Sequence, residues 1–348
     1  MRIATYNVEW FSELFDNAGN LMPDEKISGR DDISREDQIT ALGIVFERLD
    51  ADMIMVIEAP DQSRKRNTVT ALETFAAHFG LRASKGMIGF ANTTQQEIAV
   101  LYDPTCLTMR HDPKGDEPGK RDTDIAPRFD GYFKIDLDID ATEDKVSFSK
   151  PPLELEVETR GGFRFRMIGA HLKSKAPHGA STPEEAMQIS IANRRKQLAQ
   201  AVWLRRRIEE HLNRADPLIV LGDLNDGPGL DEYEGLFGRS SVEIIMGRGL
   251  TDRVLPVEAK LFDPHAAQGL SRKLGAIPTT ARFYLEDQDR YLQALLDYIM
   301  VSQDFMAKRP SWRIWHPFDT PECLADTTLR TALLVASDHF PVTLDIEF

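Results

Sequence analysis

Short apolar runs, each followed at once by a charged or amide side chain, recur along the chain. They are residues 3–6 before Asn7, 53–57 before Glu58, 167–170 before His171, 218–222 before Asp223 and Asn225, and 295–296 before Asp297. A sixth run, 342–346, begins just after Asp338 and His339. Apolar runs of four to eight residues predict strands that are buried on both faces. Charge is costly inside such a layer and cheaper at a strand end, where ligands commonly gather.

Helical patterns alternate with these predicted strands. Ser34 is placed to cap a helix whose apolar residues run from Ile39 to Leu49, and a second helix is predicted over residues 69–79. A third is predicted from Thr182, its cap, to about Leu212. Further strands are expected at 98–102, and at 151–157 and 163–165 as a meander. The pattern indicates a mixed α/β sheet protein.

Three stretches lack regular periodicity, namely residues 11–33, 105–130 and 256–280. Long loops in a compact domain are usually functional or mobile, so these stretches are candidates for substrate selection. The candidate site residues extend from Asn7 to His339. We therefore expect one domain over residues 1–348, with loop insertions near these three stretches.

Composition and charge narrow the class of protein. Apolar residues make up 42% of the chain and charged residues 28%, which is ordinary for a globular protein with ample core. No 18-residue apolar stretch exists, so no membrane span is expected. The net charge of −14 opposes sequence-independent binding to a polyanion. A local basic rim could still bind phosphate, and the candidates are Arg64, Lys173 and Lys175.

The N-terminus and the cysteines bear on location. The first apolar run begins within three residues of Met1, which leaves no room for a signal sequence and favours a cytoplasmic location. The chain has two cysteines, Cys106 and Cys323, and this scarcity suits a reducing compartment. We expect both thiols to be free.

The carboxylates at the strand ends would repel one another if they met. At an effective dielectric of roughly 20 the repulsion is about 4 kcal/mol per close pair, and a divalent cation or a bound proton would remove it. Carboxylates together with the amides of Asn7 and Asn225, without cysteine, favour Mg²⁺, with Mn²⁺ or Ca²⁺ as substitutes, over zinc. The alternative interpretation is that each carboxylate only caps a turn.

Six motifs in order give the chain a family resemblance. They are Tyr6-Asn7-Val8-Glu9, Glu58 after a strand, His171-Leu172-Lys173-Ser174, Gly222-Asp223-Leu224-Asn225-Asp226, Leu296-Asp297-Tyr298-Ile299, and Ser337-Asp338-His339. The chain resembles the endonuclease/exonuclease/phosphatase superfamily, which includes pancreatic-type deoxyribonucleases, apurinic endonucleases, inositol polyphosphate phosphatases and bacterial sphingomyelinases. The resemblance implies a four-layered α/β/β/α sandwich of two mixed sheets with outer helices. It also implies hydrolysis of a phosphate ester by water.

The resemblance further implies a metal site. Glu58 would be the principal Mg²⁺ ligand, helped by Asn7 and Asp338, and Glu9 is compatible with a second metal contact or with a supporting position. The ion would neutralise a phosphate oxygen and the charge that develops on the leaving group.

Five residues would carry the remaining chemistry. Asp223 and Asn225 would orient the attacking water and hold the phosphate. His339, paired with Asp297, would act as a general base or as a positive clamp on the phosphoryl group. His171 would contact the phosphate or donate a proton to the leaving oxygen.

The expected function is Mg²⁺-dependent hydrolysis of a phosphodiester, as in nucleases, by in-line attack of water. The substrate partner is a phosphate ester, with nucleic acid among the candidates, and no protein partner can be inferred. His171-Leu172 resembles the deoxyribonuclease, phosphatase and sphingomyelinase branches, which weakens an abasic-site role. One alternative is a phosphomonoesterase or lipid phosphodiesterase on the same scaffold. A remoter one is a catalytically silent protein that binds phosphate-bearing partners.

Overall fold

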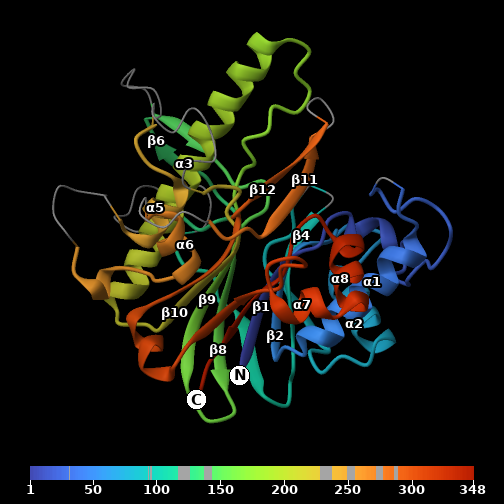
Figure 1. The fold of residues 1–348 in the computed structure, drawn as a ribbon. Coiled ribbons are helices and arrows are strands. Elements are labelled where there is room, and N and C mark those ends of the chain that lie inside the picture. Colours follow the sequence, from blue (N-terminus) through green and yellow to red (C-terminus); the bar gives the residue numbers. More distant parts are fainter. Residues whose placement is uncertain are drawn as a thin grey trace.

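Two β-sheets lie face to face between two groups of helices (Figure 1). The computed structural model describes residues 1–30, 32–92, 94, 96–116, 126–136, 143–227, 237–248, 255–271, 277–285 and 289–348. The four-layered α/β/β/α sandwich predicted from the family resemblance is confirmed.

The first sheet has six strands in the order β14-β15-β1-β2-β4-β3. The strands are β1 (Arg2–Asn7), β2 (Met53–Pro60), β3 (Lys85–Ile88), β4 (Gln96–Tyr102), β14 (Ser311–Ile314) and β15 (Val342–Asp345). β1 runs parallel to β2, with Asn7 opposite Ile57, and antiparallel to β15. The parallel pairing brings the polar ends of β1 and β2 to one edge of the sheet.

The second sheet has five strands in the order β13-β10-β9-β8-β5. The strands are β5 (Leu107–His111), β8 (Leu153–Thr159), β9 (Arg164–His171), β10 (Leu218–Asp223) and β13 (Asp297–Val301). The predicted meander is confirmed, since β8 and β9 are antiparallel neighbours. Asp223 is opposite His171 on the parallel strand β9 and opposite Asp297 on the antiparallel strand β13. The register therefore sets three candidate site residues side by side.

Helices cover the outer face of each sheet (Figure 1). The first sheet carries α1 (Arg35–Leu49), α2 (Thr68–His78) and α8 (Thr327–Ala336), and the second carries α3 (Pro183–Asn213) and α5 (Ser241–Met246). The predicted caps are present: Ser34 accepts a hydrogen bond from the backbone N–H of Asp37 at 3.1 Å, and Thr182 accepts one from Glu185 at 3.2 Å.

Short elements connect these layers. They are η1 (Phe11–Leu14), η2 (Val257–Ala259), α6 (Pro264–Gly269), η4 (Gln303–Lys308), α7 (Pro321–Ala325), and two hairpins, β6 (Phe133–Ile135) with β7 (Asp144–Val146) and β11 (Ala281–Leu285) with β12 (Arg290–Ala294). The stretches without periodicity are thus not wholly irregular: 11–33 contains η1, 105–130 contains β5, and 256–280 contains η2 and α6. β5 is only five residues long and lies at a sheet edge, which is why its pattern was weak in the sequence.

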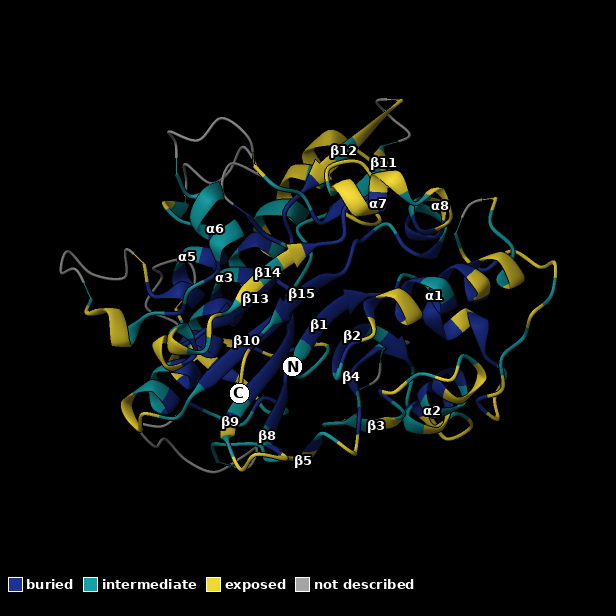
Figure 2. Cartoon of the chain, turned by 60° about the horizontal axis from the view of Figure 1, so that its bottom comes forward, coloured by how far each residue is buried: buried dark blue, intermediate teal, exposed yellow. Residues whose placement is uncertain are grey.

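The core is continuous through both sheets (Figure 2). One cluster of buried apolar side chains includes Ile3 near the N-terminus and Ile346 near the C-terminus. We propose from this continuity that the described residues form one domain. No described helix has the length and apolarity needed to span a membrane.

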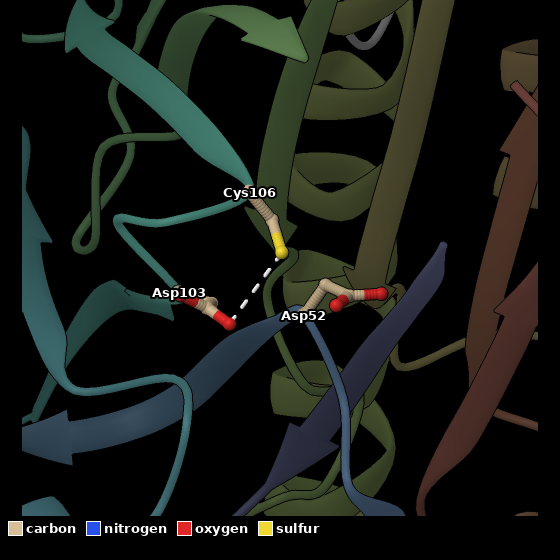
Figure 3. Close-up of side chains that lie close together, drawn as sticks. All are labelled: Asp52, Asp103 and Cys106. Atoms are coloured by element: carbon tan, nitrogen blue, oxygen red, sulfur yellow. Dashed lines mark hydrogen bonds between the residues drawn. The ribbon is translucent and has the colours of Figure 1, made fainter. Parts of the chain in front are cut away.

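An arginine joins the sheet elements at the end of β2 away from Glu58. Asp52 precedes β2 and Asp103 follows β4, and Arg82 Nη1 lies 2.7 Å from Asp52 Oδ1 and 3.2 Å from Asp103 Oδ2. The Cys106 thiol also donates to Asp103, at 3.5 Å (Figure 3). Because Arg82 already neutralises these carboxylates, we interpret the group as structural. Cys106 and Cys323 are both free, as predicted.

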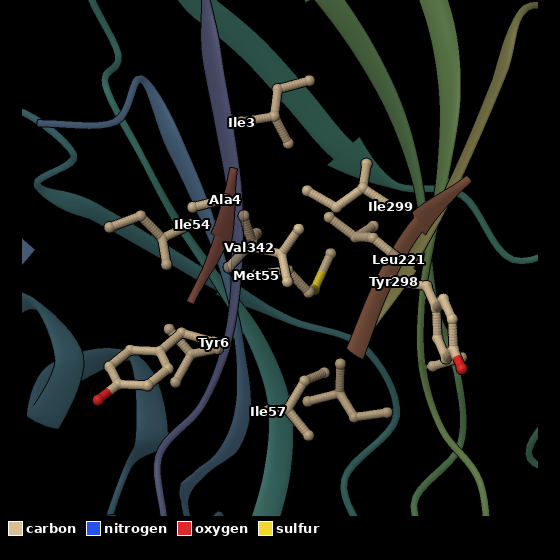
Figure 4. Close-up of a cluster of buried hydrophobic side chains, with 14 of the residues drawn as sticks. Ile3, Ala4, Tyr6, Ile54, Met55, Ile57, Leu221, Tyr298, Ile299 and Val342 are labelled. Atoms are coloured by element: carbon tan, nitrogen blue, oxygen red, sulfur yellow. The ribbon is translucent and has the colours of Figure 1, made fainter. Parts of the chain in front are cut away.

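The two sheets pack closely through apolar side chains (Figure 4). Ile3, Met55 and Ile57 from the first sheet face Leu221 and Ile299 from the second, and all five are buried. Burial of this kind of side chain contributes about 1.5–3 kcal/mol each. The tight packing holds together the edges of the two sheets at which the polar side chains lie.

Gly222 is required by the backbone immediately before Asp223. Its φ is 130°, a value that L side chains rarely adopt, and a Cβ built there would collide with the carbonyl oxygen of Ala170 on β9. The glycine thus allows β10 to approach β9 closely and to present Asp223 in register with His171.

We predict that Gly222→Ala lowers the free energy of unfolding by about 3 kcal/mol or more, because backbone strain and the collision with Ala170 add. Gly162→Ala is the matched control, since Gly162 has a φ of 83° but open space around its Cα. It should cost only about 1 kcal/mol. Urea denaturation measures the free energy of unfolding of both variants. Equal losses in Gly222→Ala and Gly162→Ala would contradict the close approach of β10 to β9.

Candidate active site

The predicted polar strand ends meet in one cavity of about 880 Å³. Ten of the predicted residues line it: Asn7, Glu9, Glu58, His171, Lys173, Lys175, Asp223, Asn225, Asp338 and His339. Asp297 lies behind His339 and contacts its ring. The cavity is therefore built from both sheets and from both ends of the chain.

Two of these side chains depend on an unusual backbone. Glu58 has a φ of 62° and is the extra residue of a bulge, since Ile57 pairs with Ile98 while Ala59 pairs with the next residue, Glu97. Asn225 has a φ of 50°. Positive φ is uncommon in residues other than glycine, and bulges often redirect side chains beside active sites. The bulge turns Glu58 into the cavity from a strand that is otherwise buried.

Asp223 lies at the centre of the site. Its Oδ2 accepts hydrogen bonds from Asn7 Nδ2 at 3.0 Å and from Asn225 Nδ2 at 3.2 Å, and its Oδ1 accepts one from the Asn225 backbone at 2.7 Å. The imidazoles of His171 and His339 approach Oδ2 to 3.6 and 4.0 Å. Burial raises the pKa of Asp223 to about 7, against the opposing charge of His339.

His339 is held by a buried carboxylate. Its Nδ1 lies 2.7 Å from Asp297 Oδ2, and the Asp297 backbone N–H donates to the hydroxyl of Thr280 at 3.0 Å. Burial alone lowers the pKa of His339, but the charge and hydrogen bond of Asp297, with the charges of Asp338 and Asp223, outweigh it. They hold the pKa of His339 well above its ordinary value. The ring is thus an imidazolium at neutral pH.

His171 has the opposite protonation state. Its Nδ1 lies 3.2 Å from the ammonium of Lys150, and burial together with the charges of Lys150 and His339 holds the pKa of His171 well below its ordinary value. An ammonium can only donate, so Nδ1 accepts and the ring proton resides on Nε2. This Nε2 faces Asp223 at 3.6 Å and Glu58 at 3.9 Å. His171 is therefore a neutral hydrogen-bond donor directed toward the site centre.

The remaining carboxylates crowd the same edge. Glu58 accepts a hydrogen bond from Gln96 and lies 3.9 Å from Lys150, while Glu9 is paired with Arg30. Burial, and then the charge of Asp338, raises the pKa of Glu9 to about 7. Burial likewise raises the pKa of Glu58. Glu9, Glu58, Asp223 and Asp338 therefore line one cavity, and burial holds the pKa of the first three above the ordinary value.

These residues fit a hard divalent cation. The Asn7 Oδ1 atom is buried and accepts no hydrogen bond from any described side chain or backbone group. Asn7 lines the cavity together with Glu58 and Asp338, so three residues with oxygen donors and no sulfur ligand are available there. Ligand atoms of Asp223, Asp297 and His339 also lie within 4.8 Å of one another, but His339 Nδ1 already binds Asp297.

The structure does not bring the predicted rim residue Arg64 together with the others. Arg64 is exposed and does not line the cavity. The segment after Glu58 turns toward η1, where Arg66 donates to the backbone oxygens of Ser12 and Phe15 at 2.9 and 2.7 Å. Lys175 does line the cavity, but it pairs with Asp226 at 2.8 Å.

Sequence reasoning missed several lining residues, among them Lys150, Gln96 and the β11–β12 hairpin. Lys150 lies in the connection between β7 and β8, where no periodicity marks it. Trp10, which follows the first motif, has a φ of 57° and lines the cavity, whereas Phe11 packs in the core. None of the described residues of 11–33, 105–130 or 256–280 lines the cavity, so the expectation that these stretches select substrate is not supported there.

The fold and the site together define a hydrolase of the kind that acts on phosphoester bonds. A sequence model of the Endonuclease/Exonuclease/phosphatase family matches residues 4–339, and the chain belongs to this family. Members of the family typically use a divalent metal, and the buried acidic and histidine groups could hold one.

Solved structures similar to this chain include truncated TDP2 from Caenorhabditis elegans, with 14% identity, a TM-score of 0.49, and coverage of 100% of this chain and 97% of that one. The human Nocturnin catalytic domain with bound sulfate has 15% identity, a TM-score of 0.49 and coverage of 100% and 94%. A mannosyl-6-phosphatase from Bacteroides thetaiotaomicron has 14% identity, a TM-score of 0.49 and coverage of 100% of both chains. No curated protein matches the chain.

We predict that, in metal-free protein, the pKa of His339 lies above the ordinary range of an imidazole and the pKa of His171 lies below it. His339 should remain protonated well above pH 6.5, and His171 should remain neutral well below it. Because the folded-state pKa of His339 is raised, the stability that its ion pair contributes is fully present below pH 6.5 and is lost as pH rises through the raised pKa. Nitrogen-15 NMR of protein with labelled histidine measures both pKa values, and the variants His171→Gln and His339→Gln assign the signals. Two ordinary titrations near pH 6.5 would contradict the described pairs.

We also predict that Lys150→Met lowers turnover by about 10- to 100-fold, because His171 loses the donor that fixes its tautomer and the cavity loses a cation. Lys150→Arg should retain more activity, since it still donates and is charged. Lys145→Met is the control, because Lys145 lies on β7, five residues earlier, and is exposed. Steady-state kinetics measures the turnover of each variant. Equal activity of Lys150→Met and wild type would show that Lys150 does not contribute to the site.

Proposed function

We propose that this protein hydrolyses a phosphodiester with the help of Mg²⁺, by in-line attack of water. The observation that supports this most strongly is the buried Asp223 carboxylate, with a pKa of about 7, between a cationic and a neutral imidazole. A carboxylate whose pKa lies near the working pH is suited to accept a proton from water.

We propose that Glu58, Asp338 and the Asn7 Oδ1 atom hold the ion, with Mn²⁺ or Ca²⁺ as substitutes. The unpaired Asn7 oxygen and the crowding of carboxylates support this assignment. When bound, Mg²⁺ would offset the charge of a phosphate oxygen and of the leaving group. Glu9 is proposed as a supporting residue instead of a second metal ligand, because Arg30 and Trp10 already engage its two oxygens.

The proton of the attacking water would go to Asp223, which Asn7 and Asn225 hold by hydrogen bonds. Asn225 would fix the water or the phosphate through its amide. The protonated state of His339 argues against its use as the first base, because an imidazolium has no free lone pair. His339 would instead hold the phosphoryl group by charge, and Asp297 would keep it protonated.

His171 would donate a hydrogen bond from Nε2 to the phosphoryl group or to the leaving oxygen. Lys150 supports this role by occupying Nδ1. The donor cannot easily become a second imidazolium, since burial and Lys150 disfavour its charge. The two histidines would thus bind the phosphate from two sides of Asp223 with different protonation states.

A second candidate is a phosphomonoesterase or lipid phosphodiesterase with the same site chemistry. The net charge of −14 and the apolar residues in the cavity wall favour it over a polynucleotide substrate. A panel of DNA, nucleotides, inositol phosphates and sphingomyelin separates these candidates by which compound is hydrolysed.

We predict that Glu58→Gln lowers Mg²⁺-dependent hydrolysis of bis(p-nitrophenyl) phosphate by about 100-fold or more, because a carboxylate ligand of the ion is lost. Glu97→Gln is the matched control: Glu97 is a buried carboxyl on the adjacent strand with a pKa of about 7, but it does not line the cavity. Its variant should keep the activity and the response to Mg²⁺.

Removal of divalent ions by EDTA should abolish turnover in wild type and in Glu97→Gln, and added Mg²⁺ should restore it. Titration calorimetry of Mg²⁺ provides the second readout, since Glu58→Gln should bind the ion more weakly. Folded wild-type protein that cleaves no ester of the panel with Mg²⁺ or Mn²⁺ would refute the proposed function. So would full activity in Glu58→Gln.

A further inference from the structure

The β11–β12 hairpin presents an apolar face to the cavity and a polar aromatic face to solvent. Phe283, Leu285 and Leu292 line the cavity, whereas Tyr284 and Tyr291 are each 50% exposed. Phe283 is directly opposite Leu292 in the pairing register, so both point to the same side. The alternation therefore places an apolar wall of Phe283, Leu285 and Leu292 on one face of a two-stranded ribbon, with Arg290 opposite Leu285 at the end of the wall.

This wall begins where the catalytic groups end. The ring of Phe283 meets that of His339 edge to face, with centroids 5.6 Å apart. The hairpin and the N-terminal part of α3 both project beyond the strand ends in Figure 1. Lys173 and Lys175 line the cavity from the segment before α3. The cavity thus has a polar, cationic side and an apolar side, with Asp223 and His339 between them.

The size of the cavity exceeds what a phosphate group needs. Pockets of about 300–1,000 Å³, largely apolar with a few placed polar groups, are typical for whole small organic ligands. The 880 Å³ volume falls in that range. Leu292, Leu285 and Phe283 are only partly buried by the protein, so a ligand could cover them further. Covering apolar surface contributes about 25 cal/mol per Å².

The charges disfavour a polynucleotide along the same wall. A strand of nucleic acid needs cations that follow its backbone. Four of the described lysine and arginine residues line the cavity, namely Lys150, Lys173, Lys175 and Arg194. Lys175 and Arg194 pair with Asp226 at 2.8 and 2.6 Å, and Lys150 lies 3.2 Å from His171 Nδ1, so most of these cations are already engaged within the protein. The chain as a whole carries −14. A small ester with an apolar organic group fits the wall better than a polyanion does.

We propose that the inner face of β11–β12 is a binding subsite for the alkyl or aryl group of a small phosphate ester whose phosphoryl group binds beside Asp223 and His339. The location of the phosphoryl group rests on the proposed function. The apolar group would lie on Phe283, Leu285 and Leu292, and so the hairpin would select the substrate.

Titration calorimetry of methyl, butyl and hexyl phosphate, with Mg²⁺ present, tests the subsite on the full-length protein. In wild type, Kd should fall roughly two- to fourfold for each added methylene. Leu292→Asn should remove at least half of this gain. Tyr291→Asn, which introduces the same residue one position away on the outer face, should keep it. Leu285→Asn provides a second inner-face variant, and circular dichroism confirms folding of all three.

If the Kd of wild type is the same for methyl, butyl and hexyl phosphate, the proposal of an apolar subsite is overturned. Equal loss in Tyr291→Asn and Leu292→Asn would overturn it as well, because the effect would then not come from the inner face. If alkyl phosphates bind with the expected dependence but no ester is hydrolysed, the proposed function fails and the subsite stands. If esters are hydrolysed and the dependence is absent, the proposed function stands and the subsite fails.

Discussion

The site depends on the close packing of the two sheets, and the hydrogen bond from Asn7 to Asp223 crosses from one sheet to the other. Asn7 ends β1 in the first sheet, and Asp223 ends β10 in the second. The bond forms only where the two sheets approach closely with their strand ends aligned. The core between the sheets therefore fixes the distance between the proposed metal-binding side, at Glu58 and Asn7, and the hydrolytic side, at Asp223.

Burial of Asp223 then sets the chemistry around it. A carboxylate with little water around it holds its proton more tightly, and this raises its pKa toward the working pH. The same burial makes the neighbouring charges strong, so that Asp297 keeps His339 protonated while Lys150 helps keep His171 neutral. The two histidines thus acquire different roles from the residues beside their Nδ1 atoms, Lys150 for His171 and Asp297 for His339. The left-handed backbone at Glu58 and the carboxylates with raised pKa values are local costs that the core must offset.

Much of this arrangement was predictable from the sequence. The apolar runs before Asn7, His171 and Asp223 placed these residues at strand ends, since period and length mark buried strands strongly. Glu58 was expected at a strand end too, but it lies at a bulge inside β2, which continues to Pro60. Their meeting in one cavity required the order of the strands, which the family resemblance supplied and which runs of apolar residues do not encode. The pairing of His339 with Asp297 came from the same source.

Other features could not be predicted because no local pattern carries them. Lys150 reaches His171 from an irregular connection, and only the tertiary fold brings the two together. Arg64 is exposed and lies outside the cavity, because the chain after β2 turns toward η1, where Arg66 binds the backbone. The apolar wall belongs to β11–β12, a short hairpin just after the stretch at 256–280 that seemed the better candidate.

A crystal structure of the protein with Mn²⁺ and inorganic phosphate tests the central claim most directly. The account predicts an anomalous peak at coordination distance from Glu58, with Asp338 and Asn7 around it, and phosphorus between His171 and His339 beside Asp223. An ion bound instead at Asp52 and Asp103, or a phosphate bound outside the cavity, would contradict it.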